Sequence, residues 1–414
     1  MNELQKPKYG AMVKVAVLTI IVSQYLVGCL TSPLLGQINA MYPQYPTLVK
    51  QLETIPTLAA IIPCLLIGPL NKYMTKKNML ILGNVLALFQ IFPAFISGFP
   101  ILYACRFLAG LGSGFMYSFA ASFIVDMFDG KEQNNMMGMR SAVGAIAGVI
   151  ILQLSGIWAT QTGNYQKSFL LTLIYVPIIV IVIIFMPKTT PVEEAERALM
   201  RAPKDEKAEK PKDFTSLTWG LIIMAVINIM FANTFMTNAA IVVYTDPAQG
   251  GLGMTPAVAG NVMSLFSVAM AVSGFIFGPF WQGKFKNYTT AVGVCIATVG
   301  LLISYLAGNI TVMFIGAIVF GFGFQVYNGG ICLLLPITGR PEAATRIIGI
   351  FFAFQNAGTF LASLVTPAIA NALFPEALKR DWMIAIPGLA VCTVIYFILS
   401  KKADKRAKEL GYTK

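Results

Sequence analysis

Two charged side chains lie well inside long apolar stretches, Glu53 in residues 47–70 and Arg106 in residues 99–125. A charge at the centre of a bilayer costs about 2.5–3.5 kcal/mol, so embedded charges are candidates for a function. Both lie ~10 Å along a helix from the same membrane face, so they could pair. In one interpretation Arg106 holds an anionic substrate or the deprotonated Glu53, and protonation of Glu53 couples transport to a proton gradient. In the other they form a fixed ion pair between two helices, or Glu53 simply extends to the membrane surface.

Neutral polar side chains also fall inside the apolar stretches. Arg106, Gly110, Gly114 and Tyr117 share one helical face, and small residues on such a face let a neighbouring backbone approach closely. We therefore interpret the glycines as packing residues. The other polar side chains inside the stretches include Gln24, Tyr25, Asn233, Asn238, Gln325 and Asn328. They either face a cavity or form hydrogen bonds between helices, which are worth about 0.6 kcal/mol per contact.

The elements that must position these residues are twelve apolar stretches. Most reach the ~20 residues that a helix needs to cross ~30 Å of hydrocarbon. We therefore predict an all-α, polytopic membrane protein with twelve transmembrane helices. The stretches are 11–36, 47–70, 78–97, 99–125, 136–159, 167–186, 217–244, 256–281, 288–307, 310–337, 343–372 and 382–400.

Composition and charge agree with this class. The chain is 57% hydrophobic and only 12% charged, whereas a soluble domain has about 25% charged residues. Most of the 30 Lys and Arg fall in the termini and in every second polar break, which predicts that both termini are cytoplasmic. The net charge of +12 thus reflects the orientation of the helices in the membrane. We expect the chain to contact the lipid bilayer and not a nucleic acid.

The chain has no histidine, and its six cysteines all lie inside apolar stretches without a CxxC pair. Histidine relays, imidazole metal ligands and Ser-His catalysis are thereby excluded, and the cysteines are interpreted as packing residues. We expect no metal, no cofactor and no enzymatic activity. Because no charged residue lies between Lys286 and Arg340 or between Asp246 and Lys284, we also expect the C-terminal half to lack an embedded ionisable group.

One long polar segment, 187–215, divides the chain, and we interpret it as a cytoplasmic linker. The halves repeat features at an offset of 210 positions: Gly68-Pro69 matches Gly278-Pro279, and Glu132 matches Glu342. Such repeats indicate duplicated six-helix bundles. We predict bundles at 1–186 and 216–400, with a basic cytoplasmic tail at 401–414.

The chain resembles the major facilitator superfamily of secondary transporters over essentially its whole length. The helix signature of an Arg followed by Gly-x-Gly appears as Arg106-Phe-Leu-Ala-Gly110-Leu-Gly112. The loop signature appears in residues 68–77, which keep its Gly, its Leu and its final basic pair but lose its acidic residue. The resemblance implies a gating role for that loop, which offers Asn71, Lys72, Lys76 and Lys77. It also implies two pseudo-symmetric bundles and a central cavity lined by the first, fourth, seventh and tenth helices. The candidates for substrate binding that this cavity implies are Arg106, Gln24, Tyr25, Tyr117, Asn233, Asn238, Gln325 and Asn328.

The resulting hypothesis is a secondary active transporter in the cell (plasma) membrane that works by alternating access. We expect it to carry a small organic solute, an organic anion, with protons as the coupling ion, and to be a monomer. The alternative is a multidrug/proton antiporter. That group places a proline directly after a Gly-x-x-x-Gly pair, and here Gly148 is followed by Val149, which weakens the alternative. A membrane receptor or a membrane enzyme is less well supported, because no acidic or metal-binding residues cluster.

Overall fold

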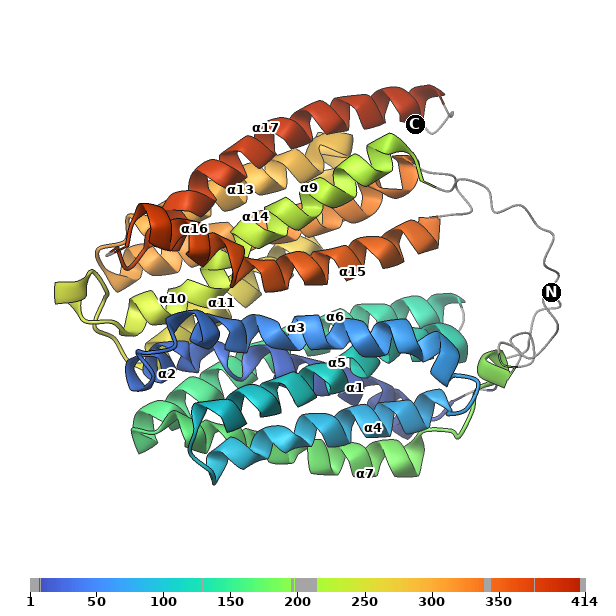
Figure 1. Cartoon of the computed structure of the whole chain (residues 1–414). Coiled ribbons are helices and arrows are strands. Elements are labelled where there is room, and N and C mark those ends of the chain that lie inside the picture. The colour runs from blue at the N-terminus through green and yellow to red at the C-terminus, as the bar shows by residue number, and fades with distance from the viewer. Residues whose placement is uncertain are drawn as a thin grey trace. The chain divides into compact units, whose positions relative to one another are not determined.

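The computed structural model describes residues 7, 9–128, 130–194, 197, 214–338, 344–375 and 377–409, and in these residues it is helical with no strand (Figure 1). Their contacts divide the chain into two units: residues 1–31 with 55–209, and residues 32–54 with 210–414. These units follow packing in this structure, so the predicted bundle boundaries stay a prediction.

Unit 1 contains the helices of the N-terminal half, apart from residues 32–54. They are α1 (Ala11–Cys29), the inner part of α3 (Pro46–Leu70), α4 (Lys76–Leu88), η2 (Phe89–Ala94), α5 (Phe99–Met127), α6 (Gly130–Thr162), η3 (Tyr165–Ile174) and α7 (Tyr175–Phe185).

Unit 2 contains the C-terminal helices together with a short segment of the N-terminal half, residues 32–54. That segment comprises η1 (Ser32–Leu34), α2 (Leu35–Met41) and the first residues of α3. The remaining main helices are α9 (Ser216–Ala232), α10 (Thr234–Tyr244), α11 (Pro256–Phe275), α13 (Thr289–Tyr305), α14 (Ile310–Leu334), α15 (Ala344–Ala362), α16 (Val365–Leu373) and α17 (Arg380–Glu409). Shorter turns are η4 (Pro247–Gln249), η5 (Phe277–Gln282), α12 (Gly283–Phe285), η6 (Lys286–Tyr288) and η7 (Pro336–Thr338).

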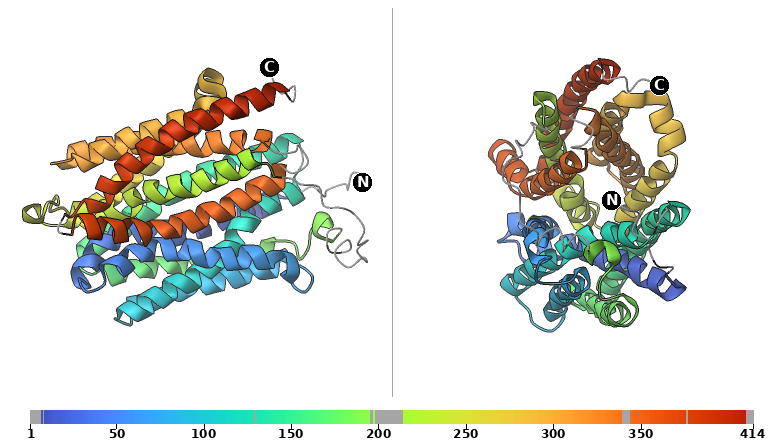
Figure 2. Two further views of the ribbon diagram at one scale, coloured as in Figure 1. Left: turned by 45° about the horizontal axis from the view of Figure 1, so that its top comes forward. Right: turned by 90° about the vertical axis from the view of Figure 1, so that its right-hand side faces the viewer.

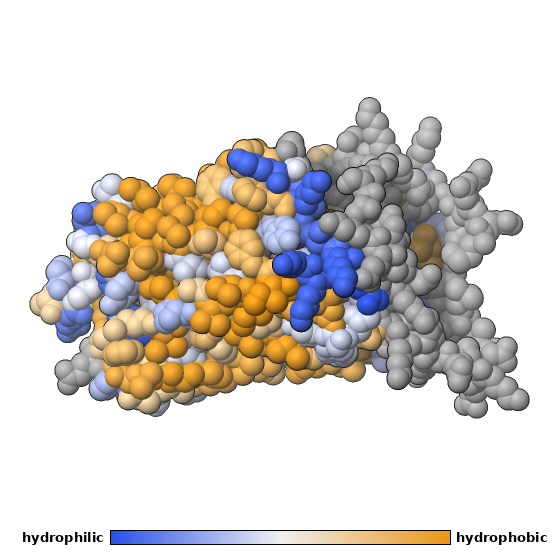
Figure 3. Space-filling model, turned by 90° about the horizontal axis from the view of Figure 1, so that it is seen from above, coloured by the Kyte–Doolittle hydropathy of each residue, from blue (hydrophilic) through white to orange (hydrophobic). Residues whose placement is uncertain are grey.

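Twelve stretches of the described chain are long and apolar enough to cross a membrane, as the sequence predicts. Apolar side chains on the outer surface of α17 are exposed, among them Val391, Val394 and Ile398, each more than half exposed. Figure 3 shows the face of unit 2 that carries this helix, with apolar residues over most of it and hydrophilic residues gathered toward its ends. An exposed apolar face of this kind suits contact with lipid.

Several spans are two helices joined by a break. Pro33 lies in η1 between α1 and α2, and Pro336 lies in η7 at the end of α14. A proline ring removes a backbone donor and clashes with the preceding turn, so it ends or bends a helix. The regular helices are therefore interrupted at these two prolines.

Glycines set the closest helix contacts in both units. In unit 1 a Cβ built on Gly112 of α5 would lie 2.2 Å from the carbonyl oxygen of Gly83 in α4. In unit 2 a Cβ on Gly323 of α14 would lie 2.2 Å from the backbone nitrogen of Ala297 in α13. The α4–α5 and α13–α14 pairs pack extensively (Figure 1, Figure 2). Equivalent glycines thus serve equivalent pairs, which agrees with the packing interpretation.

Candidate functional site

Arg106 lies on α5 and is fully buried. Its Nη1 donates to the carbonyl oxygen of Val27 on α1 at 2.7 Å and to Oε1 of Gln90 in η2 at 2.8 Å. Gln90 is itself fully buried and was not singled out from the sequence. These contacts tie α5 to two neighbouring elements of unit 1, which a positioning residue would do. A direct role of Arg106 in substrate binding stays a prediction.

Glu53 lies on the outer part of α3, within unit 2. Its Oε1 accepts a hydrogen bond of 2.7 Å from the Ser32 hydroxyl, which comes from η1. Arg106 belongs to unit 1, so the predicted pairing of Glu53 with Arg106 joins residues of different units and stays a prediction.

The predicted residues of unit 1 other than Arg106 lie on α1 and α5. The ring of Tyr25 packs against α6, where Cβ atoms built on Gly144 and Gly148 would lie 2.7 and 2.9 Å from its ring carbons. Gln24 precedes it, and its Oε1 is buried without a hydrogen-bond partner among the described residues. Tyr117 on α5 is 56% exposed. Tyr25 and Tyr117 therefore present hydroxyls from two different helices.

The predicted residues of unit 2 make hydrogen bonds within that unit. Asn233, at the break between α9 and α10, donates from Nδ2 to Thr359 Oγ1 on α15 at 2.9 Å. Asn328 on α14 accepts at Oδ1 from Gln355 Nε2, also on α15, at 2.9 Å. Both contacts are hydrogen bonds between helices, which is the alternative to substrate binding for these residues. The other two residues differ: Asn238 donates to Thr234 and Thr237 of its own helix, and Gln325 lies beside Gly274 of α11.

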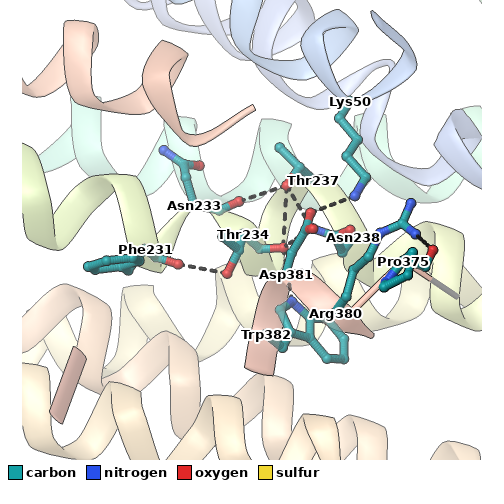
Figure 4. A network of polar contacts seen from close by, with 10 residues as sticks. All are labelled: Lys50, Phe231, Asn233, Thr234, Thr237, Asn238, Pro375, Arg380, Asp381 and Trp382. Carbon is teal, nitrogen blue, oxygen red and sulfur yellow. Dashed lines mark hydrogen bonds and ion pairs between the residues drawn. The ribbon is translucent and has the colours of Figure 1, made fainter. Parts of the chain in front are cut away.

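A buried ion pair lies at the outer end of unit 2. Nζ of Lys50 on α3 is 2.5 Å from Oδ2 of Asp381 at the start of α17, and the two residues are 7% and 1% exposed. Figure 4 shows Asp381 beside the polar residues of α10, where Trp382 Nε1 donates to the Thr234 carbonyl at 3.0 Å. The expectation that the C-terminal half has no embedded ionisable group is therefore wrong. Asp381 sits just before the apolar stretch in sequence, but the packing of α3 and α10 against α17 buries it.

The predicted gating loop connects α3 to α4, and the beginning of the linker docks on it. The Lys76 ammonium lies 2.7 Å from Oδ2 of Asp126 on α5, and its backbone N–H donates to Oε1 of Glu193 at 2.9 Å. Arg197 Nε donates to the Asn71 carbonyl at 2.7 Å. Asp126 thus supplies a carboxylate to the loop, which in this chain has lost the acidic residue of the family signature.

The other two lysines of the loop, Lys72 and Lys77, behave differently. Lys77 Nζ donates to the carbonyl oxygens of Ile183 and Met186 at 2.8 and 2.7 Å, and so satisfies the C-terminal end of α7. Lys72 is exposed. Of the four predicted gating residues, Asn71, Lys76 and Lys77 are therefore brought together with the α7–linker segment, and Lys72 points to solvent.

Glu193 was not predicted as a site residue, because residues 187–215 have the composition of a polar linker. Its carboxylate is buried, and Oε2 has no hydrogen-bond partner among the described residues. Burial raises the pKa of the Glu193 carboxyl above its usual value, against the opposing effects of Lys76 and Arg197.

An apolar groove of about 260 Å³ lies elsewhere in unit 1, between α1, α6 and η3. Its lining is aliphatic and includes Val22, Leu26 and Ile150. A surface of this kind offers no charge or hydrogen-bond donor that would fix a polar solute. Among the described residues no three His, Cys, Asp or Glu side chains gather as metal ligands would.

A model of the family described as the Major Facilitator Superfamily matches residues 15–363. The chain belongs to this superfamily. It is 25% identical over 155 residues to the uncharacterized MFS-type transporter YfiU of Bacillus subtilis (strain 168), which is 37% of this chain and 29% of that protein.

Solved structures of Major Facilitator Superfamily transporters share the fold. The nucleoside transporter NupG aligns with a TM-score of 0.72 at 11% identity, over 94% of this chain and 98% of that one. An inward-facing, unoccupied bacterial homolog of the human lysosomal transporter Spinster aligns with 0.72 at 15% identity, over 95% and 97%. A variant of the peptide transporter POT in complex with sulfate aligns with 0.72 at 11% identity, over 95% of each chain. At such low identity these likenesses establish the fold alone.

The predicted family and the all-α fold with twelve membrane helices are thereby confirmed. The chain is a multi-pass membrane protein of a superfamily of transporters.

Proposed function

We propose that the chain carries a small organic anion across the plasma membrane by alternating access, coupled to protons, with both termini in the cytoplasm. The observation that carries the coupling is the buried Lys50–Asp381 pair. A buried charge whose counter-charge is removed is poorly solvated, so separating α3 from α17 costs free energy as long as both residues stay charged and buried.

This pair supports a cycle in which the outer end of unit 2 opens and closes. While Lys50 and Asp381 are paired, their attraction holds the two helix ends together. Neutralisation of either charge removes the attraction, and the helix ends are then free to separate. Glu53 lies one turn after Lys50 on α3, so a second carboxylate stands at the same end of the molecule.

The anion class is supported by Arg106, a guanidinium inside the membrane-spanning part of unit 1. Guanidinium groups recognise carboxylates with two parallel hydrogen bonds and keep their charge at every physiological pH. The gating proposal is supported by the contacts of Lys76 and Lys77, which join the α3–α4 loop to α5 and α7.

The test is transport by the purified protein in liposomes. Small carboxylates are first screened for a solute-dependent pH change in a weakly buffered suspension. Accumulation of the responding solute is then measured with the pH gradient directed inward and outward, which distinguishes proton symport from efflux by antiport.

Asp381→Asn tests the coupling step, and Asp404→Asn is its matched control. Asp404 lies near the other end of the same helix, where it accepts a hydrogen bond from Asn287 Nδ2 at 3.0 Å. We expect Asp381→Asn to abolish accumulation driven by the pH gradient while exchange of labelled solute continues. Asp404→Asn should accumulate solute like the parent. Gradient-driven accumulation in Asp381→Asn at the parent level would rule out this coupling site.

A further inference from the structure

Arg140 is a second guanidinium of unit 1 that the sequence reading passed over. It lies on α6, about 15 Å along the helix from Gly130 at 1.5 Å per residue. It is partly buried, and its Nε is enclosed without a hydrogen-bond partner among the described residues. Its charge also takes part in none of the ion pairs found in that part of the chain. An enclosed guanidinium donor without an acceptor is costly, so a partner for Arg140 from outside the chain would be stabilising.

Two tyrosines from other helices lie in the electrostatic field of this charge, Tyr25 of α1 and Tyr117 of α5. Tyr25 is held in place by α6 itself, because a Cβ on Gly144, one turn after Arg140, would lie 3.1 Å from the Tyr25 hydroxyl oxygen. Glycine at that position lets the ring lie against α6 without a shift. The cation and the two hydroxyls thus come from α6, α1 and α5.

The surface around these groups is open to a ligand. Tyr117 is more than half exposed, and Arg140 is partly so. On α1 a Cβ built on Gly28 would meet nothing within 4 Å. Gln24, beside Tyr25, has a buried Oε1 without a hydrogen-bond partner among the described residues, so this side of α1 already has unsatisfied polar atoms. The aliphatic groove of unit 1 uses other residues of α1 and α6 and has none of this polarity.

We infer that Arg140, Tyr25 and Tyr117 form the subsite that binds the anionic group of the transported solute. A carboxylate would accept two hydrogen bonds from the guanidinium and further ones from the hydroxyls, which is the geometry that Arg provides and Lys does not. Arg106 then holds α1 and η2 in place, while Arg140 contacts the solute. This inference rests on the proposed function and names the residue that confers its preference for anions.

The experiment measures binding without transport. The full chain, purified in a neutral detergent, is heated with benzoate, lactate or succinate and in parallel with benzamide, lactamide or succinamide. The parent should be stabilised in a concentration-dependent way by at least one acid and not by its amide. Arg140→Gln should raise the apparent Kd of that acid at least tenfold, and Arg140→Lys should give an intermediate value. Tyr25→Phe and Tyr117→Phe should each weaken binding by a few fold.

Arg406→Gln is the matched control, because it removes one guanidinium from the cytoplasmic part of α17 and changes the net charge equally. It should bind the acid like the parent. Equal binding by Arg140→Gln and the parent, equal stabilisation by acid and amide, or no stabilisation by any acid would overturn the inference. So would an effect of Arg140→Gln that appears only with added phosphatidylglycerol, because the anion would then be a lipid head group. If Arg140→Gln does not elute as a monodisperse peak, Arg140→Lys and the two tyrosine variants decide.

The two proposals fail separately. Loss of gradient-driven accumulation in Asp381→Asn with unchanged acid binding supports the coupling proposal whatever Arg140 does. Acid binding that depends on Arg140 in a protein that shows no proton coupling would leave the subsite standing and remove the coupling.

Discussion

Glu193 accepts a hydrogen bond of 2.9 Å from the backbone N–H of Lys76, so a residue of the linker caps the first turn of α4. A carboxylate at this position is favoured by the partial positive charge of a helix N-terminus. Arg197 makes the complementary contact with the Asn71 carbonyl just after α3. The start of the linker is thus fixed to the α3–α4 loop by one acidic and one basic side chain.

We expect the attachment of Glu193 to the start of α4 to tighten as the pH falls. Burial raises the pKa of the Glu193 carboxyl, and the charged groups acting on it are Lys76, Arg197 and Asp126. A carboxyl whose pKa is raised in the docked state binds a proton more readily there, so its contribution to docking improves as pH falls toward its ordinary pKa. Hydrogen exchange at the start of α4, corrected for intrinsic rate, should therefore slow between pH 7 and pH 5. Glu193→Gln should abolish this trend, and a trend of equal size in that variant would contradict the assignment.

Breaking the Lys50–Asp381 pair on one side should destabilise unit 2 more than removing both partners. Lys50→Met leaves a buried carboxylate without its counter-charge, which costs about 3 kcal/mol in comparable buried pairs. Lys50→Met combined with Asp381→Leu removes the desolvation cost of both charges and should recover most of that loss. The free energy of unfolding in detergent, measured for both single variants and the double variant, gives the coupling energy directly. Additive effects would mean that the pair is not buried in solution.

Gly112→Ala should disrupt the α4–α5 contact. The added Cβ would lie 2.2 Å from the Gly83 carbonyl oxygen, and a backbone atom cannot move aside without separating the helices. We expect a loss of about 2 kcal/mol or more, as for overpacking elsewhere. Gly220→Ala on α9 is the control, because its Cβ would meet nothing within 4 Å and alanine favours a helix by up to about 1 kcal/mol. Thermal unfolding of the two variants in the same detergent should shift in opposite directions.

Arg106→Ala should lower stability and transport together. The substitution leaves the buried Val27 carbonyl and Gln90 side chain without the donor that they share, which costs about 1–3 kcal/mol. Gln90→Leu is a milder test, because it removes one of these acceptors and keeps the guanidinium. It should reduce stability while leaving the Kd for an acid within a factor of three. If Arg106→Ala keeps the stability of the parent and loses only acid binding, Arg106 contacts the solute and its structural role is wrong.

The sequence was sufficient for the membrane helices and for their closest contacts. A hydrophobic span is a local property, and a Gly-x-Gly run such as Gly110 and Gly112 marks a close helix contact wherever the helix packs. The candidate site was less accessible. Lys50 and Asp381 are 331 positions apart, so their pairing depends on how the helices assemble.

Other residues were missed for physical reasons of a different kind. Glu193 belongs to a polar segment whose composition resembles a free linker, and only its docking on α4 buries the carboxylate. Arg140 lies near the polar beginning of a long helix, where a basic residue indicates topology in most cases. The role that we propose for it rests on Tyr25 and Tyr117, which come from two other helices, and no local pattern contains that relationship.

Residues 32–54 are synthesised well before the helices of unit 2 with which they pack. Lys50 therefore enters the bilayer while Asp381 does not yet exist. A chain that ends in the linker would leave this lysine without its carboxylate and residues 32–54 without the helices that they pack with, and exposed packing surfaces favour degradation. Co-expression of the two halves as separate polypeptides should therefore rescue each from degradation.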